Sequence, residues 1–243
     1  MAIELKNGAV FLHIPKTGGN WITKILTELD LIEKRVGHKH ADIDHFFLTP
    51  PARSRKAMLK LIAQRILKPQ TLTNKPYMFC FVRNPLSWYE SWFKYMEQPS
   101  RQWRFWGDEK DISKWHPNSI LNSLGQCSFE EFVRNVNKKR PGYITELYGW
   151  YTKPQIDFIG RQECLVDDFI KVLNLMNVDF DEEFIRNFGK VGVSPNPKKE
   201  LIWPDDLKTE TALNEYAGMI RYGYHSTLKD IGLDAKHLTR RCT

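Results

Sequence analysis

The feature that most constrains the fold is a glycine turn between a strand pattern and a helix pattern near the start of the chain. The segment reads FLHIPKTGGNWITKIL over residues 11–26. An apolar run at residues 9–14 leads into the turn at residues 15–19, and an amphipathic stretch follows at residues 21–29. The backbone N–H groups of a helix that begins after such a turn are a ready anion site. The segment therefore predicts a strand, an anion-binding turn and a helix.

The turn differs from the phosphate-binding loop of nucleotide triphosphatases. That loop places a lysine after its last glycine and a hydroxyl residue next to it, and the hydroxyl binds magnesium. Here Lys16 precedes both glycines, and Asn20 and Trp21 stand where the lysine and the hydroxyl residue are expected. The segment therefore predicts an anion site that lacks the magnesium ligand of such a loop.

The rest of the chain alternates strand and helix patterns. Nearly continuous apolar runs at residues 77–82 and 156–160 are typical of buried parallel strands. Strands separated by helices indicate an α/β fold with a mostly parallel central sheet flanked by helices. The 243 residues are enough for one sizeable core and few for two, so we expect a single domain over residues 1–243. Helical patterns cover residues 21–29, 53–67, 86–96, 129–136, 166–176, 181–188 and 207–221.

The charge and the cysteine content bear on the class of ligand and on the cellular compartment. The net charge of +7 favours acidic ligands without identifying them. The four cysteines, at positions 80, 127, 164 and 242, have neither metal-ligand nor redox-motif spacing, which predicts a reducing compartment. The first residues carry no basic leader or apolar signal core, and no later stretch approaches the roughly 20 apolar residues that span a bilayer. We therefore expect a cytoplasmic protein without a membrane span.

A second candidate anion site follows the second strand. Ligands of α/β sheets bind beyond the carboxyl ends of the strands. The turn at residues 15–19 follows the first strand, and Arg83, Asn84 and Pro85 follow the second. Together they place a lysine, an arginine and two helix N-termini at one edge of the sheet. This arrangement suits an anion with several phosphate-like groups.

The two segments resemble the donor site of sulfotransferases that use 3′-phosphoadenosine 5′-phosphosulfate (PAPS). P-K-T-G-G-N-W at residues 15–21 resembles their 5′-phosphosulfate loop. F-V-R-N-P-L-S-W-Y-E-S-W at residues 81–92 resembles their 3′-phosphate motif, in which a serine stands eight residues after an arginine, as Ser91 does after Arg83. D-F-I-G-R-Q-E at residues 157–163 is similar to a strand-then-helix stretch of bacterial and carbohydrate-type members, although Gln162 and Cys164 replace an aromatic residue and an asparagine.

This resemblance implies a fold similar to that of P-loop NTPases, and an enzyme that moves a sulfuryl group from PAPS to an acceptor hydroxyl. The product is 3′-phosphoadenosine 5′-phosphate (PAP), and no metal is required. Lys16, with the backbone N–H groups of the loop, would neutralise charge on the leaving phosphate. Thr17 would donate its hydroxyl to the 5′-phosphate. The donor-binding residues that the resemblance implies are Pro15, Lys16, Thr17, Gly18, Gly19, Asn20, Trp21, Arg83 and Ser91.

The acceptor hydroxyl must lose a proton, so a general base is needed. K-H-A-D at residues 39–42 resembles the K-H-A-T segment of bacterial relatives, which makes His40 the candidate base and His38 its alternate. Histidine titrates near neutrality and suits this role. Two alternatives remain for this segment. The histidines are surface or helix-capping residues, or they form a metal site with Asp42, Asp44 and His45, although nothing else in the chain supplies a metal framework.

Two further segments bear on the acceptor. Residues 53–75 carry seven basic residues and no acidic one, which fits either an acidic ligand or a solvated helix face. The segment W-R-F-W at residues 103–106, with Trp115, is either a sugar-stacking lid or a small satellite core. Residues 193–199 stand where cytosolic members have a G-x-x-G-x-x-K loop. We expect the acceptor hydroxyl on a carbohydrate, with an acidic glycan as the candidate.

Two other functions remain open at this point. One is a P-loop kinase of a nucleotide or small molecule, against which the position of Lys16 and the missing magnesium hydroxyl both argue. The other is a catalytically inactive module that binds nucleotides or nucleic acid. The basic charge permits nucleic-acid binding, but the sequence has no recognised binding motif, so we do not expect a nucleic-acid partner.

Overall fold

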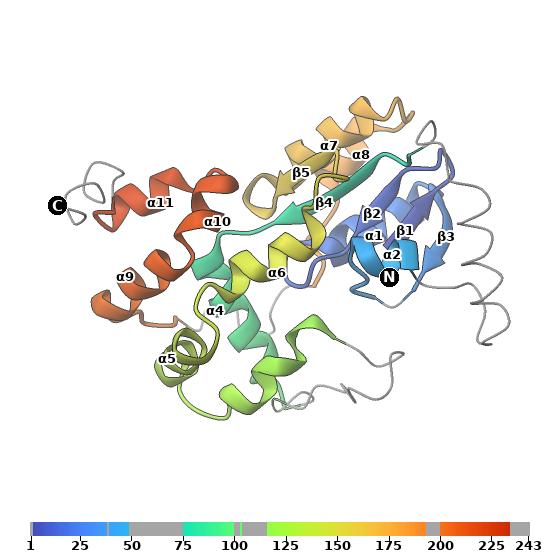
Figure 1. The fold of residues 1–243 in the computed structure, drawn as a ribbon. Coiled ribbons are helices and arrows are strands. Elements are labelled where there is room, and N and C mark those ends of the chain that lie inside the picture. Colours follow the sequence, from blue (N-terminus) through green and yellow to red (C-terminus); the bar gives the residue numbers. More distant parts are fainter. Residues whose placement is uncertain are drawn as a thin grey trace, which may run out of the picture.

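The computed structural model describes residues 2–37, 39–48, 75–99, 103, 116–192 and 200–233. Its centre is a five-stranded sheet in the order β3-β1-β2-β4-β5 (Figure 1). β2, β4 and β5 are parallel, whereas β1 pairs antiparallel with both β2 and β3. The predicted α/β fold with parallel core strands is confirmed. The strands are β1 (Ala2–Leu5), β2 (Val10–Leu12), β3 (Ile32–Val36), β4 (Met78–Val82) and β5 (Phe158–Arg161).

Helices cover both faces of the sheet, which explains why the central strands are apolar throughout. On β2, Val10 and Leu12 face one core while Phe11 faces the other. The first of these cores includes α4 (Pro85–Met96) and α6 (Tyr143–Tyr151). The second includes α1 (Gly19–Glu28) and α7 (Leu165–Leu175). Since α1 follows β2 and α4 follows β4, neighbouring parallel strands send their helices to opposite faces. A crevice forms at such a point at the carboxyl edge of an α/β sheet.

Most of the predicted helices are present with shifted ends. The pattern over residues 207–221 forms two helices that meet at Glu215, because the chain turns there to bury this carboxylate. The helix predicted over residues 53–67 lies outside the described residues. The remaining elements are α2 (Ile43–Leu48), η3 (Pro117–Leu124), α5 (Phe129–Lys139), η4 (Gln162–Cys164), α8 (Glu182–Asn187), α9 (Asp205–Asn214), α10 (Tyr216–Arg221) and α11 (His225–Asp230).

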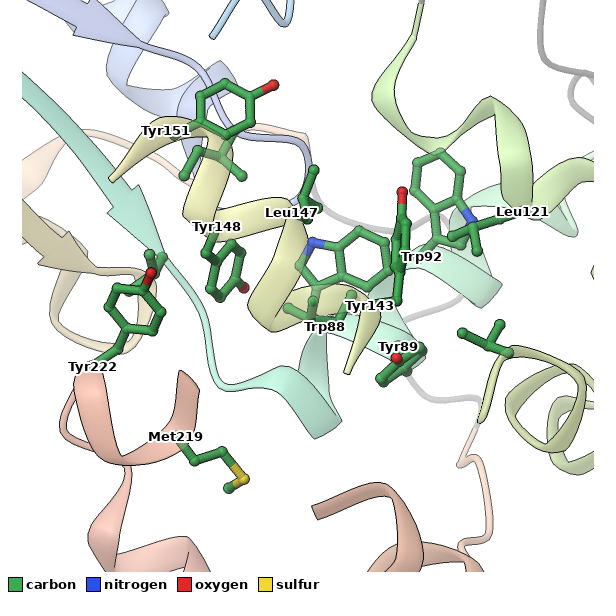
Figure 2. Close-up of a cluster of buried hydrophobic side chains, with 14 of the residues drawn as sticks. Trp88, Tyr89, Trp92, Leu121, Tyr143, Leu147, Tyr148, Tyr151, Met219 and Tyr222 are labelled. Atoms are coloured by element: carbon green, nitrogen blue, oxygen red, sulfur yellow. The ribbon is translucent and has the colours of Figure 1, made fainter. Parts of the chain in front are cut away.

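An aromatic core lies between α4 and α6 and contacts the glycine turn. Figure 2 shows Trp88 and Trp92 of α4 beside Tyr143 of α6. The two tryptophan rings are stacked with centroids 5.6 Å apart. Trp88 is fully buried, and its Nε1–H donates to the carbonyl of Pro15 at 2.8 Å. Large aromatic side chains dominate the energetics of such cores. The Trp88 hydrogen bond therefore ties the glycine turn to the aromatic core.

A buried carboxylate ties the C-terminal helices to α6. Glu215 is inaccessible to solvent and accepts hydrogen bonds from the Tyr89 hydroxyl at 2.9 Å, the Ile144 N–H at 2.9 Å and the Thr145 N–H at 2.7 Å. The Thr145 hydroxyl adds a fourth bond at 2.6 Å. The Ile144 and Thr145 amides belong to the first turn of α6, where backbone N–H groups have no partner within the helix. Burial raises the pKa of Glu215, and these donors oppose the rise.

Glu215→Ala should destabilise the fold markedly. The change leaves two backbone amides and two hydroxyls without their acceptor, and a buried unsatisfied donor costs about 1–3 kcal/mol. We expect the free energy of unfolding in urea to fall by roughly 2–4 kcal/mol. Glu210→Ala, at an exposed position of α9, is the matched control and should change it by less than about 0.5 kcal/mol. Equal effects of the two substitutions would contradict this account of α6.

Candidate functional site

Two residues of the glycine turn have left-handed backbone conformations, and contacts inside the turn stabilise it. Lys16 has a φ of 66° and Gly18 a φ of 87°, so one non-glycine residue adopts a backbone conformation that costs about 1–3 kcal/mol. Gly18 also packs closely, since a Cβ there would lie 2.8 Å from Leu165 Cδ2. The Thr17 hydroxyl is buried and donates to the Ile14 carbonyl at 3.0 Å. The hydroxyl that the family resemblance assigned to the 5′-phosphate thus donates its hydrogen bond within the turn itself.

A pocket of about 620 Å³ adjoins this turn. This volume is typical of small-molecule sites. It lies where β2 and β4 end, between the N-terminal parts of α1 and α4. Seven of the nine predicted donor-binding residues line the pocket: Lys16, Gly18, Gly19, Asn20, Trp21, Arg83 and Ser91. The other two, Pro15 and Thr17, are buried and do not line it. The structure therefore brings the two sequence motifs into one cavity.

The charged side chains in the described lining of this pocket are mostly cationic. Besides Lys16 and Arg83, they include Lys94, Lys190 and Arg186, which the sequence analysis did not single out. Arg186 is paired with Asp167 and Glu182, so its charge is largely compensated. One carboxylate, that of Glu90, also lines the pocket and accepts a hydrogen bond from the Trp203 indole at 2.8 Å. The excess of positive charge suits an anionic ligand. The spacing Glu90, Ser91, Lys94 on one helix could have revealed Lys94, because residues four apart share a face.

The segment after β4 is fixed through its backbone. The Tyr148 hydroxyl accepts from the Arg83 N–H at 3.1 Å and donates to the Arg83 carbonyl at 2.7 Å. Asn84 then caps α4 by accepting from the Leu86 N–H at 3.0 Å. The Arg83 guanidinium donates through Nε to the Ser87 hydroxyl at 3.0 Å. Burial lowers the pKa of Arg83, but a guanidinium stays charged at any physiological pH. Arg83 is therefore a positioned cation.

Side chains from β5 onward brace the same segment. Glu163 accepts from the Asn84 N–H at 2.8 Å and from the Tyr224 hydroxyl at 3.1 Å. The Asn84 amide group donates to the Thr227 hydroxyl at 2.8 Å. Thr227 belongs to α11, far along the chain from Asn84. The C-terminal segment thus contacts the Asn84 side chain directly and the Asn84 N–H through Glu163.

The Lys16 ammonium lies over an aromatic ring. Its nitrogen is 4.3 Å from the centroid of the Tyr95 ring, which is within cation–π range. Tyr95 belongs to α4, and its ring centroid is 5.8 Å from that of Trp92. The aromatic core under the turn therefore extends to the lysine side chain.

His40 is buried in a cluster of imidazole rings. It is 8% exposed, and its ring centroid lies 4.9 Å from that of His13 and 4.6 Å from that of His116. Nδ1 of His40 is 2.9 Å from the His13 carbonyl, which can only accept. Nδ1 therefore carries a hydrogen, and Nε2 is the nitrogen that takes up a proton. His40 is therefore not a surface residue. It does not itself line the pocket but lies behind His13, which does. His38 lies outside the described residues.

The acidic residues of the same segment have structural partners. Asp42 caps α2 by accepting from the His45 N–H at 2.9 Å, and its carboxylate is 2.8 Å from His45 Nδ1. Burial alone would raise the pKa of Asp42, but the hydrogen bonds from His45 lower it, and the same bond raises the pKa of His45. Asp44 pairs with Lys153. Within the described residues, no three His, Cys, Asp or Glu side chains are grouped so that they could hold a metal ion.

Trp103 belongs to the core and is not a sugar-stacking surface. It is 6% exposed, and its ring centroid is 4.9 Å from that of Phe132. Gly125 makes room for it, since a Cβ there would lie 2.0 Å from the Trp103 ring. The satellite-core interpretation is therefore right for this residue. Residues 53–74, 104–106, 115 and 193–199, on which the other acceptor predictions depend, lie outside the described residues.

Comparison with known proteins agrees with this geometry. The sequence model described as the sulfotransferase family matches residues 1–191, so the chain belongs to the sulfotransferase family. This membership supports a transferase that moves sulfuryl groups. No curated protein and no solved structure gave a significant match. None of the helices in the described residues has the length and apolar character that crossing a membrane requires. The cytoplasmic location stays a prediction.

Proposed function

We propose that the protein transfers the sulfuryl group of PAPS to an acceptor hydroxyl. The observation that carries this proposal is the shared pocket, which the Lys16 loop lines on one side and Arg83 with Ser91 on another. PAPS has a 5′-phosphosulfate and a 3′-phosphate. Two cationic sites in one pocket match this charge distribution, and a guanidinium suits the 3′-phosphate by its forked geometry. The donor and the residue assignments are parts of this proposal.

In the proposed reaction, the acceptor oxygen attacks sulfur as the bond between sulfur and the bridging oxygen breaks. PAP leaves with the bonding electrons, and the proton of the acceptor hydroxyl passes to Nε2 of His40. Negative charge grows on the bridging oxygen, as in phosphoryl transfer. Lys16 and the first N–H groups of α1 stabilise that charge. Because phosphate is already a good leaving group, the proposal assigns no metal.

For the acceptor we propose a carbohydrate hydroxyl, with an acidic glycan as the candidate. The similarity of residues 157–169 to carbohydrate-type sulfotransferases and the net charge of +7 support this choice. The burial of Trp103 removes one argument for sugar stacking. A screen of glycans, phenols and lipids as acceptors tests this part separately from the donor, and sulfation of phenols or lipids alone would exclude a glycan.

The donor assignment predicts a preference for PAP over ADP. A hydrogen bond to a charged group contributes about 1.5–3 kcal/mol, so PAP should bind roughly 10–150-fold more tightly in calorimetry. Arg83→Gln should remove most of this difference while leaving ADP affinity nearly unchanged. Arg35→Gln, at an exposed position of β3 outside the pocket, is the control. Equal affinity for the two nucleotides, or a preference for ATP with magnesium, would contradict the assignment.

A further inference from the structure

His13 lines the pocket but has no role in the reaction as described so far. It directly follows β2, and the residue is 5% exposed. That exposure is toward the pocket, whose lining His13 shares with Lys16 and Gly18. No hydrogen bond from its ring nitrogens to the described part of the chain is present. A buried polar side chain that faces a ligand pocket is a candidate for contact with the ligand.

Packing fixes the position of this ring. A Cβ at Gly19 would lie 2.1 Å from His13 Cδ2 and 2.3 Å from His13 Nε2, so only glycine fits where α1 begins. On another side, the Phe11 ring is stacked with its centroid 6.0 Å away. The Nε2 edge of His13 therefore lies against the N-terminus of α1. This location is next to the amides to which the proposed function assigns the donor's phosphate.

The environment keeps the ring uncharged. Burial lowers the pKa of His13 well below its ordinary value, and the neighbouring His40, Lys39 and His116 act in the same direction. The partial positive charge at the start of α1 adds to this effect. A neutral imidazole has one N–H donor and one acceptor nitrogen. His13 is therefore poorly suited to accept the acceptor's proton at neutral pH but can donate a hydrogen bond.

Resting on the proposed function, we propose that His13 is a catalytic residue that donates an N–H to a non-bridging oxygen of the sulfuryl group in transit. The His13 ring packs against Gly19 of the loop on one side and lies 4.9 Å from the ring of His40, the proposed base, on another. A sulfuryl group that passes from the loop toward that base would therefore pass the pocket-lining edge of His13. A fixed donor aimed at charge that develops in the transition state accelerates transfer. The same residue orients the base, because its carbonyl accepts the hydrogen of His40 Nδ1. The His13 ring and backbone thus serve the two sides of the reaction.

The test compares His13→Gln with His13→Leu. Glutamine retains an N–H donor at similar reach, and leucine removes the donor while filling the volume. The assay is sulfuryl transfer from PAPS to a hyaluronan oligosaccharide, with PAPS hydrolysis as the readout that needs no acceptor. We expect His13→Leu to lower kcat by about 10²–10³-fold and His13→Gln to keep it within about tenfold of wild type. Both should bind PAP in calorimetry as wild type does, and His13→Gln should keep the acidic limb of the pH–rate profile.

Three outcomes would overturn the proposal. If the glutamine and leucine variants are equally inactive and the acidic limb is lost in both, His13 is the base. If His13→Leu keeps wild-type kcat, the ring serves packing alone. If kcat and PAP affinity fall together, His13 acts through the donor loop and not on the sulfuryl group. Should His13→Leu fail to fold, His13→Met, which also lacks a hydrogen-bond donor, replaces it with the same readouts. Failure of wild-type protein to bind PAP would instead refute the proposed function itself.

Discussion

Replacing Lys16 by methionine should lower the rate of sulfuryl transfer by about 10²–10³-fold, the loss typical when one preorganised donor to a developing negative charge is removed. The structure gives a specific reason for the size of this effect. Lys16 sits in a left-handed turn with its ammonium over the Tyr95 ring, so its side chain is held at the mouth of the pocket. Methionine keeps the length of the side chain and its packing on Tyr95 but removes the charge.

The measurement is single-turnover PAP release from PAPS, with circular dichroism to verify the fold. Lys94→Met is the matched control, because this lysine lines the same pocket from α4 without belonging to the loop. We expect Lys94→Met mainly to weaken nucleotide binding and to change the rate at saturating PAPS much less. A Lys16→Met variant with the rate of Lys94→Met would show that general pocket charge, and not this lysine, stabilises the leaving group.

Replacing His40 by alanine should lower turnover by about 10²–10⁴-fold, the usual cost of losing a general base. PAP affinity should stay close to wild type, since the assigned role of His40 is toward the acceptor. The acidic limb of the pH–rate profile should disappear together with the activity. His40 is suited to this role because the His13 carbonyl binds its Nδ1 hydrogen, which leaves Nε2 to take the proton.

His45→Ala is the control for this experiment, because it removes a nearby histidine that is bonded to Asp42 and not to the pocket residue His13. It should keep activity within a few-fold of wild type. His38→Ala is measured in parallel. Loss of activity in His38→Ala alone would move the base to that position. Activity that requires a divalent cation and disappears on chelation would favour the metal alternative for this segment.

The parts of the site that could be predicted from the sequence are those encoded in short continuous segments. The loop at residues 15–21 and the segment from Arg83 to Ser91 each follow a strand pattern and lead into a helix pattern. The parallel core strands themselves are nearly all apolar. Their meeting in one pocket follows from the rule that ligands bind at the carboxyl edge of such sheets. The antiparallel edge was not predicted because β1 is four residues long and three of the five β3 side chains are exposed and charged.

Other features depend on contacts between distant parts of the chain. The orientation of His13 results from its packing against Gly19 and His40, and no local pattern reports it. The burial of Trp103 depends on Gly125 and Phe132, so its segment alone could not decide between a lid and a core. The Thr17 hydroxyl was assigned to the ligand by resemblance, whereas its bond to the Ile14 carbonyl is a property of the folded turn.

The hydrogen bonds that connect the C-terminal helices to the segment after Arg83 have a consequence for how the sequence can evolve. The family match ends at residue 191, yet Tyr224 and Thr227 reach back to the backbone beside Arg83 through Glu163 and Asn84. A recombination event that exchanged the last helices between two relatives would leave the Asn84 amide and the Glu163 carboxylate without their hydrogen-bond partners Thr227 and Tyr224. We therefore expect substitutions at Asn84 or Glu163 to be accompanied by compensating substitutions at Thr227 or Tyr224. A chimaera with a foreign segment after residue 200 would recover PAP affinity only when the residues facing Asn84 and Glu163 came from the same parent.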